Sequence, residues 1–318
     1  MSPLLREIVL RLGAGVFTLV AASALIYLGV SALPGDAATA ALGKDATPDL
    51  VAGLRKQFGL DRPVLERYGG WLSGFLRGNL GYSLPTGVPV TSVIRDKVWN
   101  TVVLAGVTMA LLVPLAIVLG AVSALRPDGT VDQSTAALML TLIATPQFVI
   151  GAILAVVFAV WLKWLPAVSL IDPSRPLISR PSILVLPVLT LLASALAQSV
   201  RMIRATMIEV LELPYIEAAR LNGIAEWRLL LRHALPNIVA PAIQVLAYNV
   251  PWLLGGVVIV ESVFEYRGVG LTLITAVQSR DLPTVEALAM LTTVAIVATS
   301  LCADMTVILL NPRLRRRA

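Results

Sequence analysis

The chain has 318 residues, of which 57% are hydrophobic and 14% are charged. A soluble domain carries roughly a quarter charged residues because its surface must be hydrated, so this composition excludes an ordinary soluble enzyme and a disordered chain. The net charge of +6 would indicate nucleic acid only on a soluble fold with a basic face, and no nucleic-acid partner is expected. One Cys and one His exclude disulfide frameworks and the usual metal centres, so no metal site is expected.

Six hydrophobic segments lack Asp, Glu, Lys, Arg and His over about the 20 residues that a helix needs to cross a lipid bilayer. They predict an all-α, polytopic membrane protein with six transmembrane helices, because a helix satisfies all its own backbone groups inside lipid. The segments are Leu12 to Gly35, Val98 to Leu125, Gln133 to Leu162, Pro181 to Val200, Ala234 to Val260 and Ala287 to Ala303.

The distribution of Arg predicts that both termini are cytoplasmic. An even number of spans places both ends on one side, and both ends are rich in Arg, as is the connection between the fourth and fifth spans; such residues collect on the cytoplasmic side. We therefore divide the chain into residues 1–35 (N-terminal tail and first span), 36–97 (external loop) and 98–318 (core domain, with a cytoplasmic elbow at 203–237). The terminal basic residues are Arg6, Arg11, Arg313, Arg315, Arg316 and Arg317.

The external loop is predicted to hold two helices. Thr47-Pro48-Asp49 is typical of a helix start, and a short helix to about Phe58 is expected. A second, amphipathic helix follows, for which two interpretations remain open: it lies on the outer leaflet, or it packs on a partner subunit or a delivery protein. Its apolar face, recurring at helical spacing, consists of Leu65, Tyr68, Trp71, Leu72, Phe75 and Leu76.

The segment 203–237 predicts two short helices joined by a tight turn. A proline begins the first helix, an acid and a base three residues apart share one face, and a glycine ends it in the left-handed conformation. A second helix runs to about Arg232, and a proline closes it before the next span. Two juxtamembrane helices whose Arg side chains reach lipid headgroups would give the same pattern. The residues concerned are Pro214, Glu217, Arg220, Gly223 and Pro236.

Glu217-Ala218-Ala219, followed by Gly223 and then Leu235-Pro236, resembles the EAA signature of the membrane subunits of ABC importers. In that family the short helix is a coupling helix that fits a groove on the ATP-binding subunit. The resemblance therefore implies a type I ABC importer permease fold and coupling roles for Glu217, Ala218, Ala219, Arg220, Gly223, Leu235 and Pro236.

Other segments are similar to the first permease subunit of the dipeptide, oligopeptide and nickel branch of that family. The resemblance implies a bacterial plasma membrane protein that works with a homologous second permease subunit, two ATP-binding subunits and an extracytoplasmic substrate-binding protein. Asn79 and Glu265-Tyr266-Arg267 depart from the branch pattern, which leaves substrate and partner details open. The matching segments are His233 to Asn237, Pro34-Gly35-Asp36, Phe58 to Pro63, Gly78 to Ser83, and Glu261 to Phe264 with Gly268 and Gly270.

The chain has no phosphate-binding loop of the Gly-x-x-x-x-Gly-Lys-Ser/Thr type, since its one Gly-Lys pair, Gly43-Lys44, precedes Asp45. We therefore expect no catalytic residue and no cofactor on this chain, with ATP and Mg bound by partner subunits. Our hypothesis is that closure of those subunits pushes on the elbow and rocks the spans.

Polar residues inside the predicted spans are candidates for the translocation path, because intramembrane polar groups are costly and often functional. Three of them are spaced four apart in the fifth span and share one face, although packing between helices explains such a face equally well. Asp304 is expected to pair with a C-terminal Arg. The path candidates are Gln147, Gln198, Gln244, Tyr248, Asn249 and Trp252.

The sequence leaves the cargo open. Di- or oligopeptides are the first expectation, and a nickel chelate, glutathione or a haem-like compound is the alternative. A stand-alone secondary transporter or channel is the alternative of a different class, which usually shows inverted repeats or broken helices. An intramembrane protease would need a Ser-His pair within the bilayer, whereas the single His, His233, lies in the predicted elbow.

Overall fold

The computed structural model describes residues 3–32, 39, 42, 46–57, 59, 61–171 and 179–310, and most of these are helical. Among them, extended pairing is limited to an isolated bridge between Tyr82 and Pro89, as an all-α fold predicts. Several predicted features lie outside the described residues: Pro34-Gly35-Asp36, Gly43-Lys44-Asp45, Phe58, Leu60, and Arg313 to Arg317. The side chains of Gln244 and Tyr248 also lie outside them.

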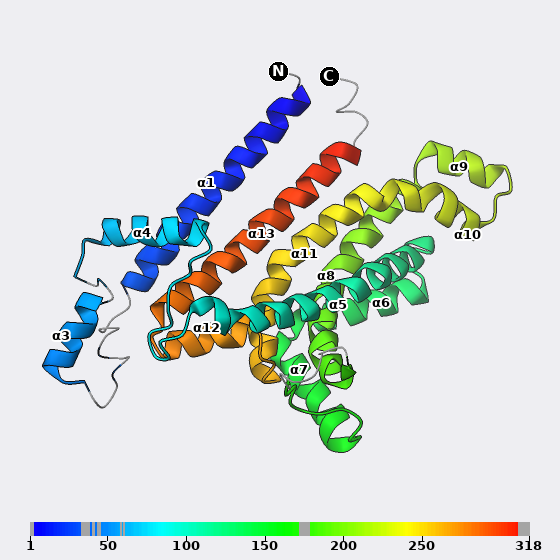
Figure 1. Cartoon of the computed structure of the whole chain (residues 1–318). Helices are drawn as coiled ribbons and strands as arrows, with labels where there is room; N and C mark the ends of the chain where they lie inside the picture. The colour runs from blue at the N-terminus through cyan, green and yellow to red at the C-terminus, as the bar shows by residue number, and fades with distance from the viewer. Residues whose placement is uncertain are drawn as a thin grey trace. The chain divides into compact units, whose positions relative to one another are not determined.

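Figure 1 shows the helices in chain order. They are α1 (Pro3–Ser31), α3 (Pro48–Gln57), α4 (Val64–Leu76), α5 (Val90–Leu125), α6 (Thr130–Ala144), α7 (Gln147–Ala155), the π-helix η2 (Val156–Trp161), α8 (Ser182–Leu211), α9 (Pro214–Leu221), α10 (Glu226–Leu229), the π-helix η4 (Leu230–Ala234), α11 (Leu235–Val263), α12 (Val269–Gln278) and α13 (Leu282–Leu310). The short helix α12 has no counterpart among the elements predicted from the sequence.

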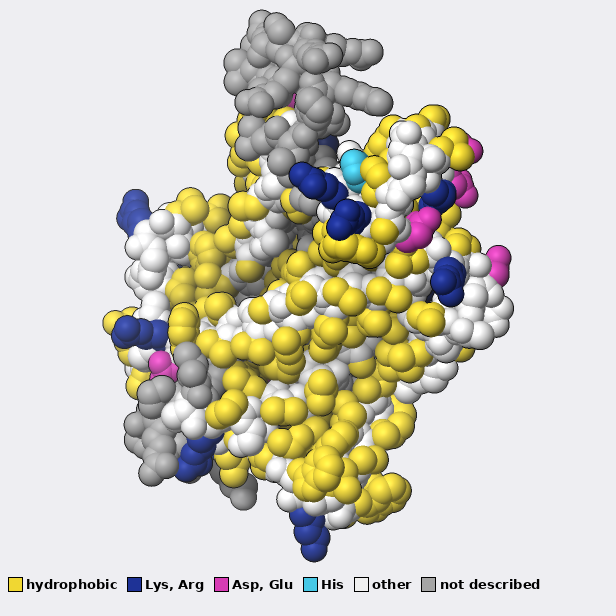
Figure 2. All heavy atoms as spheres, turned by 90° about the vertical axis from the view of Figure 1, so that its right-hand side faces the viewer, with side chains coloured by type: hydrophobic (Ala, Val, Ile, Leu, Met, Phe, Trp, Pro, Cys, Tyr) yellow, Lys and Arg dark blue, Asp and Glu magenta, His cyan; other side chains and the backbone are white. Residues whose placement is uncertain are grey.

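Four helices, α1, α5, α8 and α13, are long and apolar enough to cross a membrane, and α6 with α7 and η2 forms a bent fifth candidate. The predicted fifth span falls on α11, a helix of 29 residues, whose described part from Asn249 to Val263 is apolar. The count of six spans therefore stays a prediction. Figure 2 shows one face of the molecule covered largely by hydrophobic side chains, with charged side chains mainly toward its margins and upper part.

The expectation of one uninterrupted helix over Gln133 to Leu162 is wrong. The chain bends by 103° between α6 and α7, where Thr145 is extended (φ −91°, ψ 123°). Pro146 causes this break, because a proline disfavours the helical conformation of the preceding residue and has no N–H to donate. Gln147 is consequently the first residue of a separate helix.

The chain divides into two compact units, described separately here. The first comprises Met1–Arg11, Val103–Tyr266 and Thr299–Ala318. Its central element is α8, which packs against α6, α7 and α11. The apolar stretch of α8 is 72% buried, against 22% for α5, so α8 forms the core around which the neighbouring helices are placed.

The second unit comprises Leu12–Val102 and Arg267–Ala298. In it, the aromatic face of α4 packs on α1: the Tyr27 ring lies 5.5 Å from that of Trp71 and 5.6 Å from that of Tyr68, centroid to centroid. The Ser23 and Tyr68 hydroxyls are 2.8 Å apart. Neither interpretation of the amphipathic helix anticipated that the chain's own first helix would cover this face, although Leu65 stays 81% exposed.

A buried aspartate anchors the turn that follows α4 in the second unit. Asp281, 5% exposed, accepts hydrogen bonds from the Ser83 hydroxyl (2.6 Å), the Leu84 N–H (3.0 Å) and the Thr284 hydroxyl (2.6 Å). The turn that follows α4 is thereby tied to the start of α13. This role explains the position of Ser83 within the predicted Gly78 to Ser83 motif.

The two terminal helices meet through an ion pair within the first unit. Arg11 Nη1 lies 2.5 Å from Asp304 Oδ1, a partner that the sequence did not indicate, whereas the C-terminal Arg residues expected to pair with Asp304 lie outside the described residues. Figure 1 shows the start of α1 and the end of α13.

A close approach between α5 and α8 gives a stability prediction. A Cβ at Gly120 would lie 2.8 Å from Ile203 Cγ2 and 3.1 Å from the Arg204 backbone nitrogen. We expect Gly120→Ala to destabilise the protein by about 1–3 kcal/mol through overpacking, seen as a lower midpoint of thermal unfolding in detergent. Gly106→Ala, on the same helix with no atom within 4 Å of the new Cβ, is the control; equal shifts in both variants would contradict the prediction.

Candidate functional site

The first elbow helix, α9, begins as the sequence predicts. Leu213 is extended (φ −70°, ψ 142°) and Pro214 follows in the first turn, where its missing N–H removes no helical hydrogen bond. Glu217 lies in the first turn and Arg220 in the last, an order that complements the helix dipole. The helix is therefore specified locally, by its own residues.

The end of α9 is a Schellman turn. Gly223 has φ +77°, its N–H donates to the Arg220 carbonyl (3.0 Å), and the Ile224 N–H donates to the Ala219 carbonyl (3.3 Å). These two bonds cap carbonyls that would otherwise lack partners at the helix end. The predicted left-handed glycine is thus confirmed.

One face of α9 is buried and the opposite face is exposed. Ile216 has no exposed surface and joins the same hydrophobic cluster as Leu229 of α10 and Met207 of α8. Glu217, Ala218 and Arg220 are exposed, whereas Ala219 is half-buried. The buried face fixes the helix on the core, and the exposed face is free to meet another surface.

An ion pair crosses the turn between the two elbow helices. Arg220 Nε donates to Glu226 Oε1 (2.7 Å), and Nη2 reaches Oε2 at 3.4 Å. The hydrogen bond to Glu226 raises the pKa of Arg220. Because both side chains are about half exposed, the pair contributes only about 0.2–1 kcal/mol. The sequence analysis placed Arg220 beside Glu217 and missed this partner.

A second, polar contact joins α9 to the start of α11. The Asn237 amide donates to the Tyr215 hydroxyl (2.8 Å) and to the His233 carbonyl (2.7 Å). The sequence analysis missed both Tyr215 and Asn237 as elements of the elbow. Their spacing of 22 residues gives no local signal, and they meet only because the turn reverses the chain.

The prediction that Pro236 closes the second elbow helix is wrong. Helix α10 continues through η4 into α11 without a break, and Pro236 lies in the first turn of α11, after Leu235 (φ −54°, ψ −44°). A proline inside an α-helix clashes with the carbonyl four residues earlier. The wider turn of a π-helix, which proteins use to absorb such local strain, directly precedes Pro236.

The elbow exposes an apolar surface. Leu221 is 83% exposed and Trp227 58%, and the Arg228 guanidinium carbon lies 5.0 Å from the centre of the Trp227 ring. Exposed apolar patches edged by charges are typical of protein–protein contacts. The other large hydrophobic side chains exposed on the elbow are those of Leu213, Tyr215 and Leu231.

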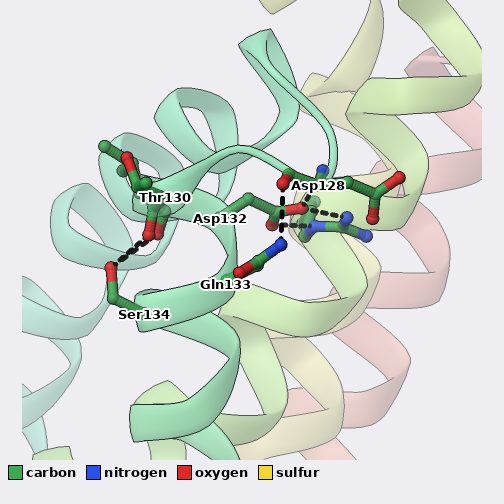
Figure 3. Close-up of polar contacts among 7 residues, drawn as sticks. Asp128, Thr130, Asp132, Gln133 and Ser134 are labelled. Carbon is green, nitrogen blue, oxygen red and sulfur yellow. Dashed lines mark hydrogen bonds and ion pairs between the residues drawn. The ribbon is translucent and has the colours of Figure 1, made fainter.

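A partly buried ion pair holds the α5–α6 turn against α8, at the start of the elbow. Arg204 contacts both carboxylate oxygens of Asp132, whose side chain is 4% exposed. The turn supports this carboxylate: the N–H of Asp128, at φ +62°, donates to it, and the Gln133 amide donates to the Asp128 carbonyl. Figure 3 shows Asp128, Asp132 and Gln133 converging at the start of α6. None of the predictions from the sequence involves this turn.

A cavity of about 430 Å³ in the first unit brings together four of the six predicted path residues: Gln147, Gln198, Asn249 and Trp252. The Asn249 amide also donates to the Ser199 hydroxyl (2.9 Å), so it is held in place by α8. Gln244 and Tyr248 have no described side chains, and their predicted roles stay predictions. The shared cavity is the geometric basis for treating the other four as one site.

Two family descriptions match the chain. Residues 116–316 match the binding-protein-dependent transport system inner membrane component, and residues 4–105 match the N-terminal part of the same kind of membrane component. The first match alone contains the elbow, the cavity and the Asp132–Arg204 pair.

Similar proteins cover nearly the whole chain. A probable peptide ABC transporter permease protein of Sinorhizobium fredii is 33% identical over 290 residues, 91% of this chain and 93% of that one. A glutathione transport system permease protein of Pectobacterium atrosepticum is 32% identical over 298 residues, 94% and 95% of the two chains. A putative peptide permease protein of Brucella suis is 30% identical over 318 residues, 98% and 99% of the two chains.

Proposed function

Because the chain belongs to the family of inner membrane components of binding-protein-dependent transport systems, we propose that it carries di- or oligopeptides. It is a multi-pass inner-membrane permease of an ABC transporter. The peptide cargo is supported by the names of the relatives from Sinorhizobium fredii and Brucella suis. Import is the direction that a binding-protein-dependent system serves.

The proposed partners are a homologous second permease subunit, two ATP-binding subunits and an extracytoplasmic substrate-binding protein. ATP and Mg belong to the ATP-binding subunits, and we assign no cofactor to this chain. We place both termini in the cytoplasm; the pairing of Arg11 with Asp304 supports a common side for both ends, and the Arg-rich elbow supports the cytoplasmic one.

The proposed coupling to ATP-binding subunits rests on the elbow, because its short helix is held by several contacts and yet exposes a surface to a partner. The buried Ile216, the Schellman turn at Gly223 and the contact between Tyr215 and Asn237 fix α9. The exposed Leu221 and Trp227 suit a groove on an ATP-binding subunit. A push on α9 is thereby passed to α8 and α11, so that ATP-driven closure rocks these helices between inward-open and outward-open states.

Glutathione is the second candidate cargo, favoured by the relative from Pectobacterium atrosepticum. Glutathione is itself a tripeptide, so the same passage suits both. The two candidates are distinguished by measuring which of them the cognate binding protein holds.

The proposal is tested with the purified complex reconstituted in liposomes with its binding protein. We expect ATP-dependent accumulation of a radiolabelled tripeptide, and co-purification of ATP-binding chains with this permease. The permease alone should accumulate nothing. Accumulation against a gradient by the permease alone would favour a stand-alone transporter and would contradict the proposal.

A further inference from the structure

One wall of the cavity in the first unit is formed by the side-chain amide of Gln147, which packs against Gly256. A Cβ at Gly256 would lie 2.8 Å from Oε1 and 2.9 Å from Nε2 of Gln147. The amide oxygen and the amide nitrogen of Gln147 therefore both lie against the backbone of α11, at similar distances from the place where a Cβ of residue 256 would stand. Only glycine leaves room for this contact, so Gly256 fixes where the Gln147 amide rests.

The amide nitrogen of Gln147 is buried and has no hydrogen-bond partner. A buried amide donor without a partner is uncommon in folded proteins, because its desolvation is not compensated. The final torsion of a Gln side chain is soft, and a half-turn exchanges Oε1 and Nε2, which lie at nearly equal distances from the position of a Cβ on Gly256. The donor can therefore turn toward a ligand in the cavity that Gln147 lines.

The cavity offers amide and hydroxyl groups and no charge. None of the described residues that line it is ionisable; its polar members are Thr145, Gln147, Ser194, Gln198 and Asn249. Neutral donors suit carbonyl oxygens and have no preference for the sign of a charge on the ligand. Trp252 and Met202 add apolar surface that accepts varied side chains.

Building on the proposed function, we infer that Gln147 binds a backbone carbonyl of the peptide in transit, and that Gly256 positions it to do so. The site recognises the peptide bond, which all peptides share, and is indifferent to the charge of their side chains. Selection by charge then belongs to other components of the transporter.

The test measures peptides imported per ATP hydrolysed by the complete complex, at saturating loaded binding protein. The probes are trialanine, Ala-Lys-Ala and Ala-Glu-Ala. Gln147→Met keeps the size of the side chain and removes its hydrogen bonds. We expect this ratio to fall about fivefold, by the same factor for all three peptides. A purely structural role would lower uptake and ATP hydrolysis together and leave the ratio unchanged.

Two glycine variants form a matched pair. Gly256→Ala pushes away the Gln147 amide, which is the flexible end of a side chain, and is expected to lower the ratio as Gln147→Met does. Gly255→Ala meets no atom within 4 Å and should leave the ratio at the wild-type value. Equal effects of the two glycine variants, or factors that differ between the charged and neutral peptides, would overturn the inference.

The wild-type complex separates this inference from the proposed function. If it imports none of the three peptides but imports glutathione, the peptide cargo is contradicted. The variants are then compared with glutathione, which also carries backbone carbonyls. If the wild type imports peptides and Gln147→Met imports as many per ATP, the role of Gln147 alone is contradicted.

Discussion

Replacing Gly223 by proline is expected to abolish ATP-driven uptake while the ATP-binding subunits, purified alone, remain active. Gly223 adopts φ +77°, whereas a proline ring fixes φ near about −65°. The substitution also removes the N–H that donates to the Arg220 carbonyl. The Schellman turn cannot form, and α9 loses the fixed angle at which it presents its exposed face. Uptake into liposomes and ATP hydrolysis by the separate subunits are the two measurements.

Two milder variants separate backbone geometry from side-chain bulk. A Cβ at Gly223 meets no atom within 4 Å, so Gly223→Ala suffers only the strain of positive φ, about 1 kcal/mol. Gly223→Asn suffers less, because Asn tolerates this conformation. The expected order of uptake is wild type, then Asn, then Ala, with none for Pro. Normal uptake by Gly223→Pro would show that the elbow does not transmit force as proposed.

Arg204→Met is expected to destabilise the protein by about 3 kcal/mol, because it leaves the carboxylate of Asp132 buried without its counter-charge. The Asp132 side chain is 4% exposed, whereas Arg204 is 30% exposed. Asp132→Asn, which leaves the half-buried guanidinium, should therefore be the milder change. The measurement is the midpoint of thermal unfolding of the detergent-solubilised complex, together with the amount of protein in the membrane.

The double variant Asp132→Asn with Arg204→Met should recover part of the loss, since no buried charge remains. Asp128→Asn is the matched control: the side chain of Asp128 is exposed, Asn tolerates its positive φ, and the contacts of Asp128 with Asp132 and Gln133 use its backbone. We expect a change below about 0.5 kcal/mol. If Asp128→Asn proves as harmful as Arg204→Met, the ion pair is not what holds the turn.

Sequence patterns predicted the elements whose cause is local. Pro214 and Gly223 act through their own backbone preferences, and both ends of α9 lie where these residues place them. The long apolar helices follow from composition alone. The bend after α6 was also visible as Pro146, but a search for stretches without charged residues does not register a single break within an apolar run.

Contacts between distant segments were beyond reach of the sequence. Arg204 and Asp132 lie 72 residues apart, and nothing in either neighbourhood indicates the other. The packing of Trp71 on Tyr27 likewise depends on which helices become neighbours. That the amide nitrogen of Gln147 is buried without a hydrogen-bond partner depends on its packing against Gly256, which is distant in the sequence. Sequence analysis selected Gln147 for its polarity and could not supply its surroundings.

The uninterrupted course of α10, η4 and α11 sets the direction in which the cavity-lining side chains of α11, Asn249 and Trp252, point. Each residue inserted or deleted between Glu226 and Asn237 would turn everything downstream by about 100° about the helix axis. Asn249 and Trp252 would then leave the cavity wall. We therefore expect uptake to be sensitive to the length of this stretch, whereas a surface loop accommodates added residues with little penalty.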